Sequence, residues 1–434
     1  MLGKRVAGMK ISIRKLSFFE IVFPLTVVFF VCIGTSFVDD LGASNLRWVF
    51  VFLLFLYLFL NKKLFIYINY WWKALLLTYL VWCMSTALWS QVPLLSFSKS
   101  ALFTFNIIVL LSTGSLWIIK YGYDRSSQWL FLILVVALAS GLLGGASAGS
   151  FDSYGSFSLY SGLNGNANAF GFLVAIVSPL IFLKLYQNKM NRRSLFLWIL
   201  ILILDIHFLT ASYSRSSFVI FSCVLGCFTL SLPLSRKILV SLLTFFCIAI
   251  VLLMMPVSYL ESMFLTHIVK LSGASTSDNV SLIFQSRRSV WQQSIARAEK
   301  GGWMGAGFGT IIGDTNFSDK GILGQVSAKY GYEKGNSQLA IMEETGIIGL
   351  ALYTLILVSF FCYAIPCYRR LQGGEKIAMG TVLGAIVGLI MESLVEGWWN
   401  SAAGPEVICF WTFVGIIFGM IYVQKRKSYN VSTE

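Results

Sequence analysis

The sequence predicts an all-α protein that crosses a membrane many times, and three observations support this prediction. Of its 434 residues 57% are apolar and 12% are charged, whereas a soluble globular protein is about 45–50% apolar and about 25% charged. Apolar runs recur at the length that a bilayer helix needs, about 20 residues. No alternation with a period of two is present, which excludes a lipid-exposed barrel. The composition also excludes a water-soluble multidomain enzyme and a nucleic-acid-binding protein, despite a net charge of +14.

Twelve stretches are apolar and close to the length of a membrane-spanning helix. They are residues 18–37, 46–60, 72–89, 98–119, 127–146, 166–186, 194–211, 215–232, 238–256, 339–367, 377–396 and 405–424. The stretch 46–60 is short for a bilayer, whereas 339–367 is long enough to tilt or to project from the membrane. We therefore expect one integral membrane domain over residues 1–434 with about 12 transmembrane helices.

The positive charges predict the orientation of these helices. Most Lys and Arg residues lie in alternate segments, at 4–15, 62–73, 120–125, 184–193, 236–237, 369–376 and 425–427. Cytoplasmic loops of membrane proteins carry such an excess of Lys and Arg. We therefore expect both termini in the cytoplasm and the nearly uncharged short loops on the outer side.

One outer loop, residues 256–335 between the ninth and tenth helices, is far longer than the others. Loops longer than about 15 residues are usually functional or disordered. Residues 281–300 place Val290, Trp291, Ile295 and Ala298 near helical spacing. A glycine-rich segment, GGWMGAGFGT, follows at 301–310. We expect an amphipathic helix at the outer membrane surface, followed by a turn.

The sequence predicts no metal site and no cofactor. The eight cysteines all fall in predicted helices, and no CxxC or Cys/His cluster occurs. The two histidines, His207 and His267, are far apart in the chain, which disfavours a zinc site.

Three arginines are candidates for a function at the outer surface. Arg215 lies at the outer end of the eighth helix, where topology needs no positive charge, and Arg287 and Arg288 begin the amphipathic segment. Guanidinium groups bind phosphate in a bidentate manner, so convergence of the three would suit a lipid pyrophosphate. Arg215 could instead be an interfacial arginine that extends to the membrane surface without a function. The segment that ends near Arg297 could instead be a solvated basic helix face.

Other polar residues near the outer helix ends have both a structural and a functional interpretation. Asn166 and Asn168 either cap the sixth helix or bind a sugar or phosphate. The acidic residues at these ends are Asp205, Glu343, Glu344, Glu392, Glu396 and Glu406. Pairing with an arginine is the structural interpretation of the acids, and a proton-coupled transport path is the functional one.

Four segments between residues 160 and 350 carry motifs. GNANAFG at 165–171 is similar to the motif GNPNxxG. Arg215, in SYSRSSF at 212–218, corresponds to a motif arginine at the outer end of a helix. SRRSVW at 286–291 followed by GAGFG at 305–309 is similar to SGRxxxW and a GxGxG turn. GNSQLAIMEETGIIG at 335–349 is similar to HNxxLxxxxExGxxG. In this order the set resembles the O-antigen ligase/polymerase superfamily of bacterial envelope glycan assembly.

The resemblance implies a membrane glycosyltransferase with a GT-C-like architecture in the bacterial inner membrane. Its donor would be an undecaprenyl-pyrophosphate-linked glycan, its active site would face the periplasm, and it would need no metal or cofactor. The implied partners are the lipid-linked donor and acceptor, the bilayer, a flippase and a chain-length regulator, with no nucleic acid.

The chain departs from the last motif at Gly335, where the family has histidine. In members that ligate glycan to a lipid A core, this histidine is regarded as the base that acts on the acceptor hydroxyl. We therefore expect a Wzy-type polysaccharide polymerase of the O-antigen or exopolysaccharide branch. The alternatives are an O-antigen ligase and, from another class, a flippase or transporter of lipid-linked glycan.

The resemblance also implies roles for single residues. Arg215 and Arg287, supported by Arg288, would hold the pyrophosphate and stabilise its developing charge. Glu333 and Asp314 are the candidates for the base. The residues expected to contact the substrate are Asn166, Asn168, Trp291, Asn336 and Glu344.

Overall fold

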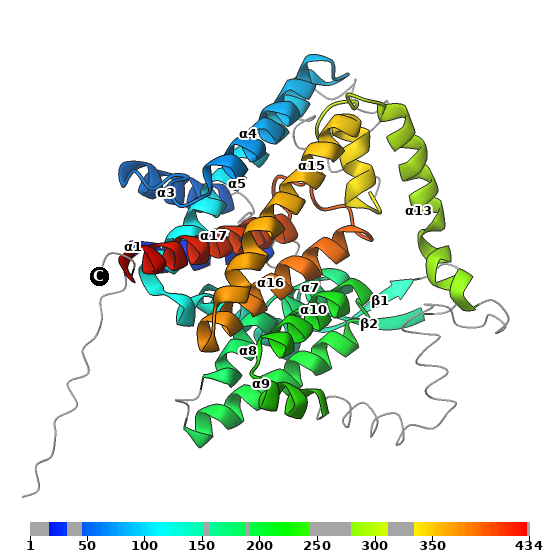
Figure 1. Cartoon of the computed structure of the whole chain (residues 1–434). Helices are drawn as coiled ribbons and strands as arrows, with labels where there is room; N and C mark the ends of the chain where they lie inside the picture. The colour runs from blue at the N-terminus through cyan, green and yellow to red at the C-terminus, as the bar shows by residue number, and fades with distance from the viewer. Residues whose placement is uncertain are drawn as a thin grey trace, which may run out of the picture.

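The computed structural model describes residues 17–32, 46–150, 156–187, 191–242, 279–310 and 334–431, and this part of the chain is almost entirely helical (Figure 1). In chain order the helices are α1 (Phe18–Val31), α3 (Leu46–Leu60), α4 (Tyr70–Ser85), η2 (Thr86–Leu88), α5 (Pro93–Tyr121), η3 (Tyr123–Arg125), η4 (Gln128–Leu130), α6 (Phe131–Leu143), α7 (Ala167–Ala175), α8 (Ser178–Tyr186), α9 (Arg192–Ala211), α10 (Arg215–Ser231), α13 (Asn279–Gly301), α15 (Ser337–Arg370), α16 (Gly373–Ser393) and α17 (Pro405–Val431).

The structure confirms the predicted fold class, an all-α polytopic membrane protein. In the described residues, 7 helical segments are long and apolar enough to cross a membrane, and α1, α3 and α10 are shorter apolar helices. Each predicted stretch contains helix, although several bounds differ: 18–37 is helical to Val31, 238–256 is helical to residue 242, and the remainder of 238–256 lies outside the described residues. The stretch 127–146 runs past the end of α6 into β1. Helix α13 covers the stretch 281–300 for which the sequence predicts an amphipathic helix.

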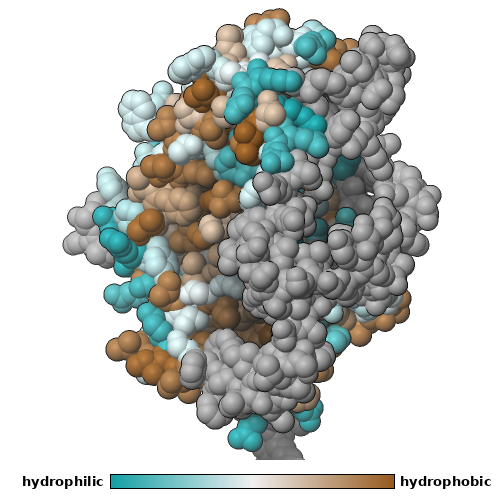
Figure 2. Space-filling model, turned by 90° about the vertical axis from the view of Figure 1, so that its right-hand side faces the viewer, coloured by the Kyte–Doolittle hydropathy of each residue, from teal (hydrophilic) through white to brown (hydrophobic). Residues whose placement is uncertain are grey.

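The surface agrees with a bilayer environment. Figure 2 shows hydrophobic residues over the middle of one face and hydrophilic residues gathered above them. Large apolar side chains are exposed along the helices, among them Trp71 at 74%, Phe196 at 69% and Leu234 at 71%. In water such a surface would be a binding or aggregation site, whereas in a membrane it faces lipid.

Two interruptions and one hairpin are not predicted by the hydropathy pattern. The stretch 166–186 forms two helices, and Pro179 stands in the first turn of α8, where its missing N–H costs nothing. Helix α15 contains a kink at Gly346, whose φ of 72° is left-handed. An antiparallel hairpin of β1 (Gly145–Ser150) and β2 (Ser156–Gly162) precedes α7.

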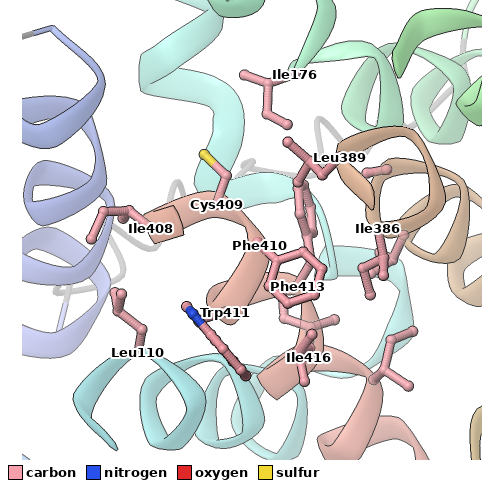
Figure 3. Packing of buried hydrophobic residues seen from close by; sticks show 14 of the residues in the cluster. Leu110, Ile176, Ile386, Leu389, Ile408, Cys409, Phe410, Trp411, Phe413 and Ile416 are labelled. Atoms are coloured by element: carbon pink, nitrogen blue, oxygen red, sulfur yellow. The ribbon is translucent and has the colours of Figure 1, made fainter. Parts of the chain in front are cut away.

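Helix α17 lies at the centre of the core (Figure 3). Its side chains Phe410, Trp411 and Phe413 are at most 1% exposed, and they pack among residues of α5 and α16 such as Leu110 and Ile386. A span buried on all sides matches a helix that is apolar around its whole circumference.

Glycines bring α10 and α16 unusually close together. Gly380, Gly384 and Gly388 recur every fourth residue along α16, and a Cβ added at Gly384 would lie 2.7 Å from the Val224 Cα of α10. The equivalent Cβ at Gly388 would lie 2.7 Å from the Ile220 Cα. Small residues at this spacing allow membrane helices to approach closely. The contact places the first turn of α10 beside the last turn of α16.

Candidate functional site

A cavity of about 640 Å³, with polar and charged side chains in its lining, lies where several helix ends meet. Its lining comes from the second and third turns of α5, the first turns of α7, α10 and α17, the last turn of α16, the part of α15 before the kink, and the loop between α16 and α17. Cavities of about 300–1,000 Å³ hold small ligands, so this one has room for sugar units.

The opposite ends of the same helices carry the positive charges. Helix α5 ends with Lys120, α8 with Lys184, and α15 with Arg369 and Arg370. Helix α17 carries residues 425–427, Lys-Arg-Lys, near its end. The cavity and the basic ends therefore lie on opposite sides of the helix bundle.

Glu344 of α15 is held by donors from three other segments. One carboxylate oxygen pairs with the Lys334 ammonium, and the other accepts from the Gly309 N–H at 2.7 Å and from Asn400 Nδ2 at 2.9 Å. Lys334 also lies 3.5 Å from Glu343 Oε2. A buried carboxylate is stable only when it is paired and hydrogen-bonded in this way. Glu344 lines the cavity, and its partners make it an anchor for the surrounding loops.

The glycine-rich turn at 301–310 packs directly against the same part of α15. The Ala306 N–H donates to the Glu343 carbonyl at 2.9 Å, and the Gly307 N–H donates to the Glu344 carbonyl at 3.0 Å. Gly305 has a φ of 77°, and a Cβ there would collide with the Glu344 carbonyl. The turn therefore needs glycine both for its backbone conformation and for space. Two motifs that are separate in the sequence thus form one unit.

Asn336 begins α15 and connects it to α16. Its Oδ1 accepts from the Leu339 N–H at 2.9 Å as an N-cap, and its Nδ2 donates to the Leu394 carbonyl at 2.7 Å. Both contacts are with protein, and Asn336 is not among the residues that line the cavity. Its described role is to position the loop after α16.

Asn166 and Asn168 lie in the cavity lining with exposed side chains. Asn166 is the N-cap of α7, and its Oδ1 accepts from the N–H groups of Asn168 at 2.8 Å and Ala169 at 3.4 Å. Asn166 therefore caps α7, as one interpretation predicted. Because it also lines the cavity, its binding of a sugar or phosphate stays a prediction.

Arg215 is the first residue of α10, directly before Ser216, which lines the cavity. Its side chain is half-buried. Ser216 hydrogen-bonds the Glu392 carboxylate of α16, an interaction that follows from the close approach of the two helices. The predicted pyrophosphate ligand Arg215 thus directly precedes a residue of the cavity lining and is not itself among the lining residues.

The arginine pair lies on α13. The structure describes the helical backbone at Arg287 and Arg288, and the side chains of both lie outside the described part. Trp291, one turn further, is half-buried and donates from Nε1 to the Gly335 carbonyl at 3.0 Å. The contact attaches α13 to the position at which the motif departs from its usual histidine.

The two candidates for the base, Asp314 and Glu333, lie outside the described residues. Where the chain is described, no three His, Cys, Asp or Glu side chains form a group that could hold a metal ion. The independence from metal therefore stays a prediction.

Two lysines of the cavity are not among the residues that the sequence singles out. Lys334 pairs with Glu344, and Lys99 of α5 lies with its Nζ 3.5 Å from the Gly309 carbonyl. A Cβ at Gly309 would lie 2.6 Å from Lys99 Cδ, so the glycine makes room for the lysine stem. The signal for Lys99 is a charge inside an apolar span, which is rare and usually functional.

Comparison with known proteins identifies the central part of the chain. Residues 198–354 match the model of the O-antigen ligase family. The match contains Arg215, the arginine pair of α13, the glycine-rich turn and Glu344, and it confirms the resemblance inferred from the motifs. A search of curated proteins gave no match to the chain.

Proposed function

We propose, since the chain belongs to the O-antigen ligase/polymerase superfamily, that it is a polymerase of a bacterial surface polysaccharide. It joins undecaprenyl-pyrophosphate-linked oligosaccharide units into O-antigen or exopolysaccharide. The observation that carries the proposal is the cavity, because motif residues Asn166 and Glu344 line it and Arg215 directly precedes Ser216 of its lining. Gly335 supports polymerase over ligase, since it offers no imidazole to act on an acceptor hydroxyl.

The proposed side of the reaction follows from the charges. The cavity lies at the helix ends opposite Lys120, Lys184 and the Arg369–Arg370 pair. Because positive flanks mark the cytoplasmic side, the cavity faces the periplasm of an inner-membrane protein with both termini in the cytoplasm. Lipid-linked units delivered by a flippase would arrive at this face, where a chain-length regulator would also act.

The chemistry needs a stabilised leaving group. The glycan is transferred from its lipid pyrophosphate to a hydroxyl of the next unit, and the negative charge on the pyrophosphate increases as the bond breaks. Arg215, with Arg287 and Arg288 of α13, supplies fixed positive charge for this group, in bidentate contacts that match phosphate.

The test is to replace the arginines and measure polymer length. Arg215→Ala and Arg287→Ala should each abolish long-chain polymer in cells while the protein accumulates normally. Arg236→Ala is the matched control, since this arginine stacks on Tyr186 at the basic side of the bundle and should leave chain length unchanged. Wild-type chain length in Arg215→Ala or Arg287→Ala would remove that residue from the proposed mechanism.

A strain that lacks this protein distinguishes the polymerase from a flippase and a ligase by the glycan intermediate that accumulates. A polymerase mutant should accumulate single lipid-linked units at the outer leaflet of the inner membrane. Accumulation at the inner leaflet would indicate a flippase, and polymerised but unattached glycan would indicate a ligase.

A further inference from the structure

Glu396 lies in the loop between α16 and α17 and is positioned by the motif at the start of α15. Ser337 Oγ donates to the Glu396 carbonyl at 2.8 Å and accepts from the Trp398 N–H at 3.1 Å. Asn336 Nδ2 donates to the Leu394 carbonyl two residues before Glu396. The motif therefore holds this loop on both sides of Glu396, whose half-buried side chain lines the cavity.

The same loop passes directly against the position of the missing histidine. A Cβ added at Gly397 would collide with the Lys334 carbonyl, so residues 397 and 334 are in backbone contact. Gly335, which replaces the histidine, follows Lys334 in the chain. The backbone of this loop thus touches the start of the motif, and the Glu396 side chain lines the cavity. A Cβ at Gly335 would itself meet Val290 and Trp291 of α13.

The other carboxylates of the cavity have different surroundings. Both oxygens of Glu344 are occupied by strong donors, among them Lys334 and the Gly309 N–H. Glu406 stands in the first turn of α17, where the helix N-terminus stabilises negative charge. These contacts assign Glu344 to holding the helices and loops together.

Glu392 indicates what kind of ligand the cavity takes. Its side chain is 3% exposed, one interaction is made with Ser216, and Oε2 has no hydrogen-bond partner among the described residues. An unpartnered buried acceptor is costly unless a ligand supplies a donor. Sugar hydroxyls are such donors, and the same lining includes Trp398, which is 5% exposed.

We propose that the cavity holds the acceptor sugar and that Glu396 accepts the proton of its reacting hydroxyl, an inference that rests on the proposed function. The hydroxyl oxygen bonds to the anomeric carbon of the donor sugar. The bond from that carbon to the pyrophosphate oxygen breaks, and its electron pair leaves with undecaprenyl pyrophosphate. The hydroxyl proton passes to the Glu396 carboxylate and then to water. Proton transfer of this kind contributes about 10²–10⁴-fold to rate.

The experiment uses the full-length protein in proteoliposomes with undecaprenyl-pyrophosphate-linked units extracted from cells that lack the chain. Glu396→Gln keeps the side-chain shape and should lower kcat by about 100-fold or more, with the KM for the acceptor and the thermal midpoint unchanged. Glu396→Asp keeps a carboxylate and should recover part of kcat. Glu375→Gln is the matched control, because this glutamate of α16 pairs with Lys427 at 2.5 Å on the basic side, and its kcat should equal that of wild type.

The outcomes separate this inference from the proposed function. If wild-type protein transfers no lipid-linked units, the proposed function is wrong. If wild type is active and Glu396→Gln has the same kcat, Glu396 is not the proton acceptor. A raised KM or a lowered thermal midpoint with normal kcat would equally overturn the inference, since it would assign Glu396 a structural role.

Discussion

Glu344 and Glu392 line the same cavity and are equally buried, with 3% of each residue exposed, yet their carboxylates have opposite surroundings. Glu344 accepts from an ammonium, a backbone N–H and an amide. Glu392 interacts with Ser216 and leaves Oε2 without a partner in the described part of the chain. Burial alone therefore does not separate a carboxylate with a full set of donors from one that leaves an oxygen without a partner among the described residues, whereas the set of partners does.

The largest expected effect is the loss of stability on removal of the Glu344 carboxylate. Glu344→Ala leaves the Lys334 ammonium and the amide of Asn400 without their main acceptor, and breaking a buried pair costs about 3–5 kcal/mol. We expect a strong fall in the thermal midpoint of the detergent-solubilised protein and in its accumulation in membranes.

Glu392→Gln is the counterpart that sharpens the comparison. It replaces a buried carboxyl group that has few hydrogen-bond partners, so the thermal midpoint should be unchanged or higher, while turnover of lipid-linked units should fall. If Glu392→Gln lowered the thermal midpoint as much as Glu344→Ala, both carboxylates would stabilise the fold.

The positions of the helices could be predicted because hydropathy is a local property. Residues 46–60 form α3 with the predicted bounds, and α5 extends the predicted stretch 98–119 to 93–121. The kink at Gly346 was not predicted by hydropathy, because the N–H groups that follow it donate to the Gly302 and Trp303 carbonyls, more than 40 residues earlier in the chain.

The assembly of the cavity could be predicted only in part. The motifs identified Asn166, Arg215 and Glu344 because each belongs to a segment with a recognisable spacing. The position of Glu396 depends on a tertiary contact with Ser337 that no local pattern records. The charge of Lys99 inside an apolar span is a local signal, but its place beside Gly309 is visible only in the fold.

The next largest expected loss of stability comes from glycine variants of the turn at 301–310, which contacts Glu344. Gly305 and Gly302 both have left-handed φ values, 77° and 57°. A Cβ at Gly305 would collide with the Glu344 carbonyl, whereas a Cβ at Gly302 would meet nothing within 4 Å. Gly302→Ala should therefore cost about 1–2 kcal/mol from backbone conformation alone. Gly305→Ala should cost about 1–3 kcal/mol more from overpacking.

Thermal unfolding of the two variants side by side measures the difference. Because the backbone penalty is common to both, the excess at Gly305 reports the contact with α15. Equal midpoints would mean that the turn moves away from Glu344 without cost, and the anchor would then consist only of the side-chain contacts of that residue.

The smallest expected effect concerns Asn166, which caps α7 and also lines the cavity. Asn166→Ala removes the N-cap of α7 and should cost about 1 kcal/mol, whereas Asn166→Ser keeps a capping oxygen and should restore the thermal midpoint. The exposed Nδ2 amide is absent from both variants, so we expect turnover to stay low in Asn166→Ser if this group binds substrate. Recovery of both stability and turnover in Asn166→Ser would assign Asn166 to capping alone and place it with Glu344 among the anchors of the cavity.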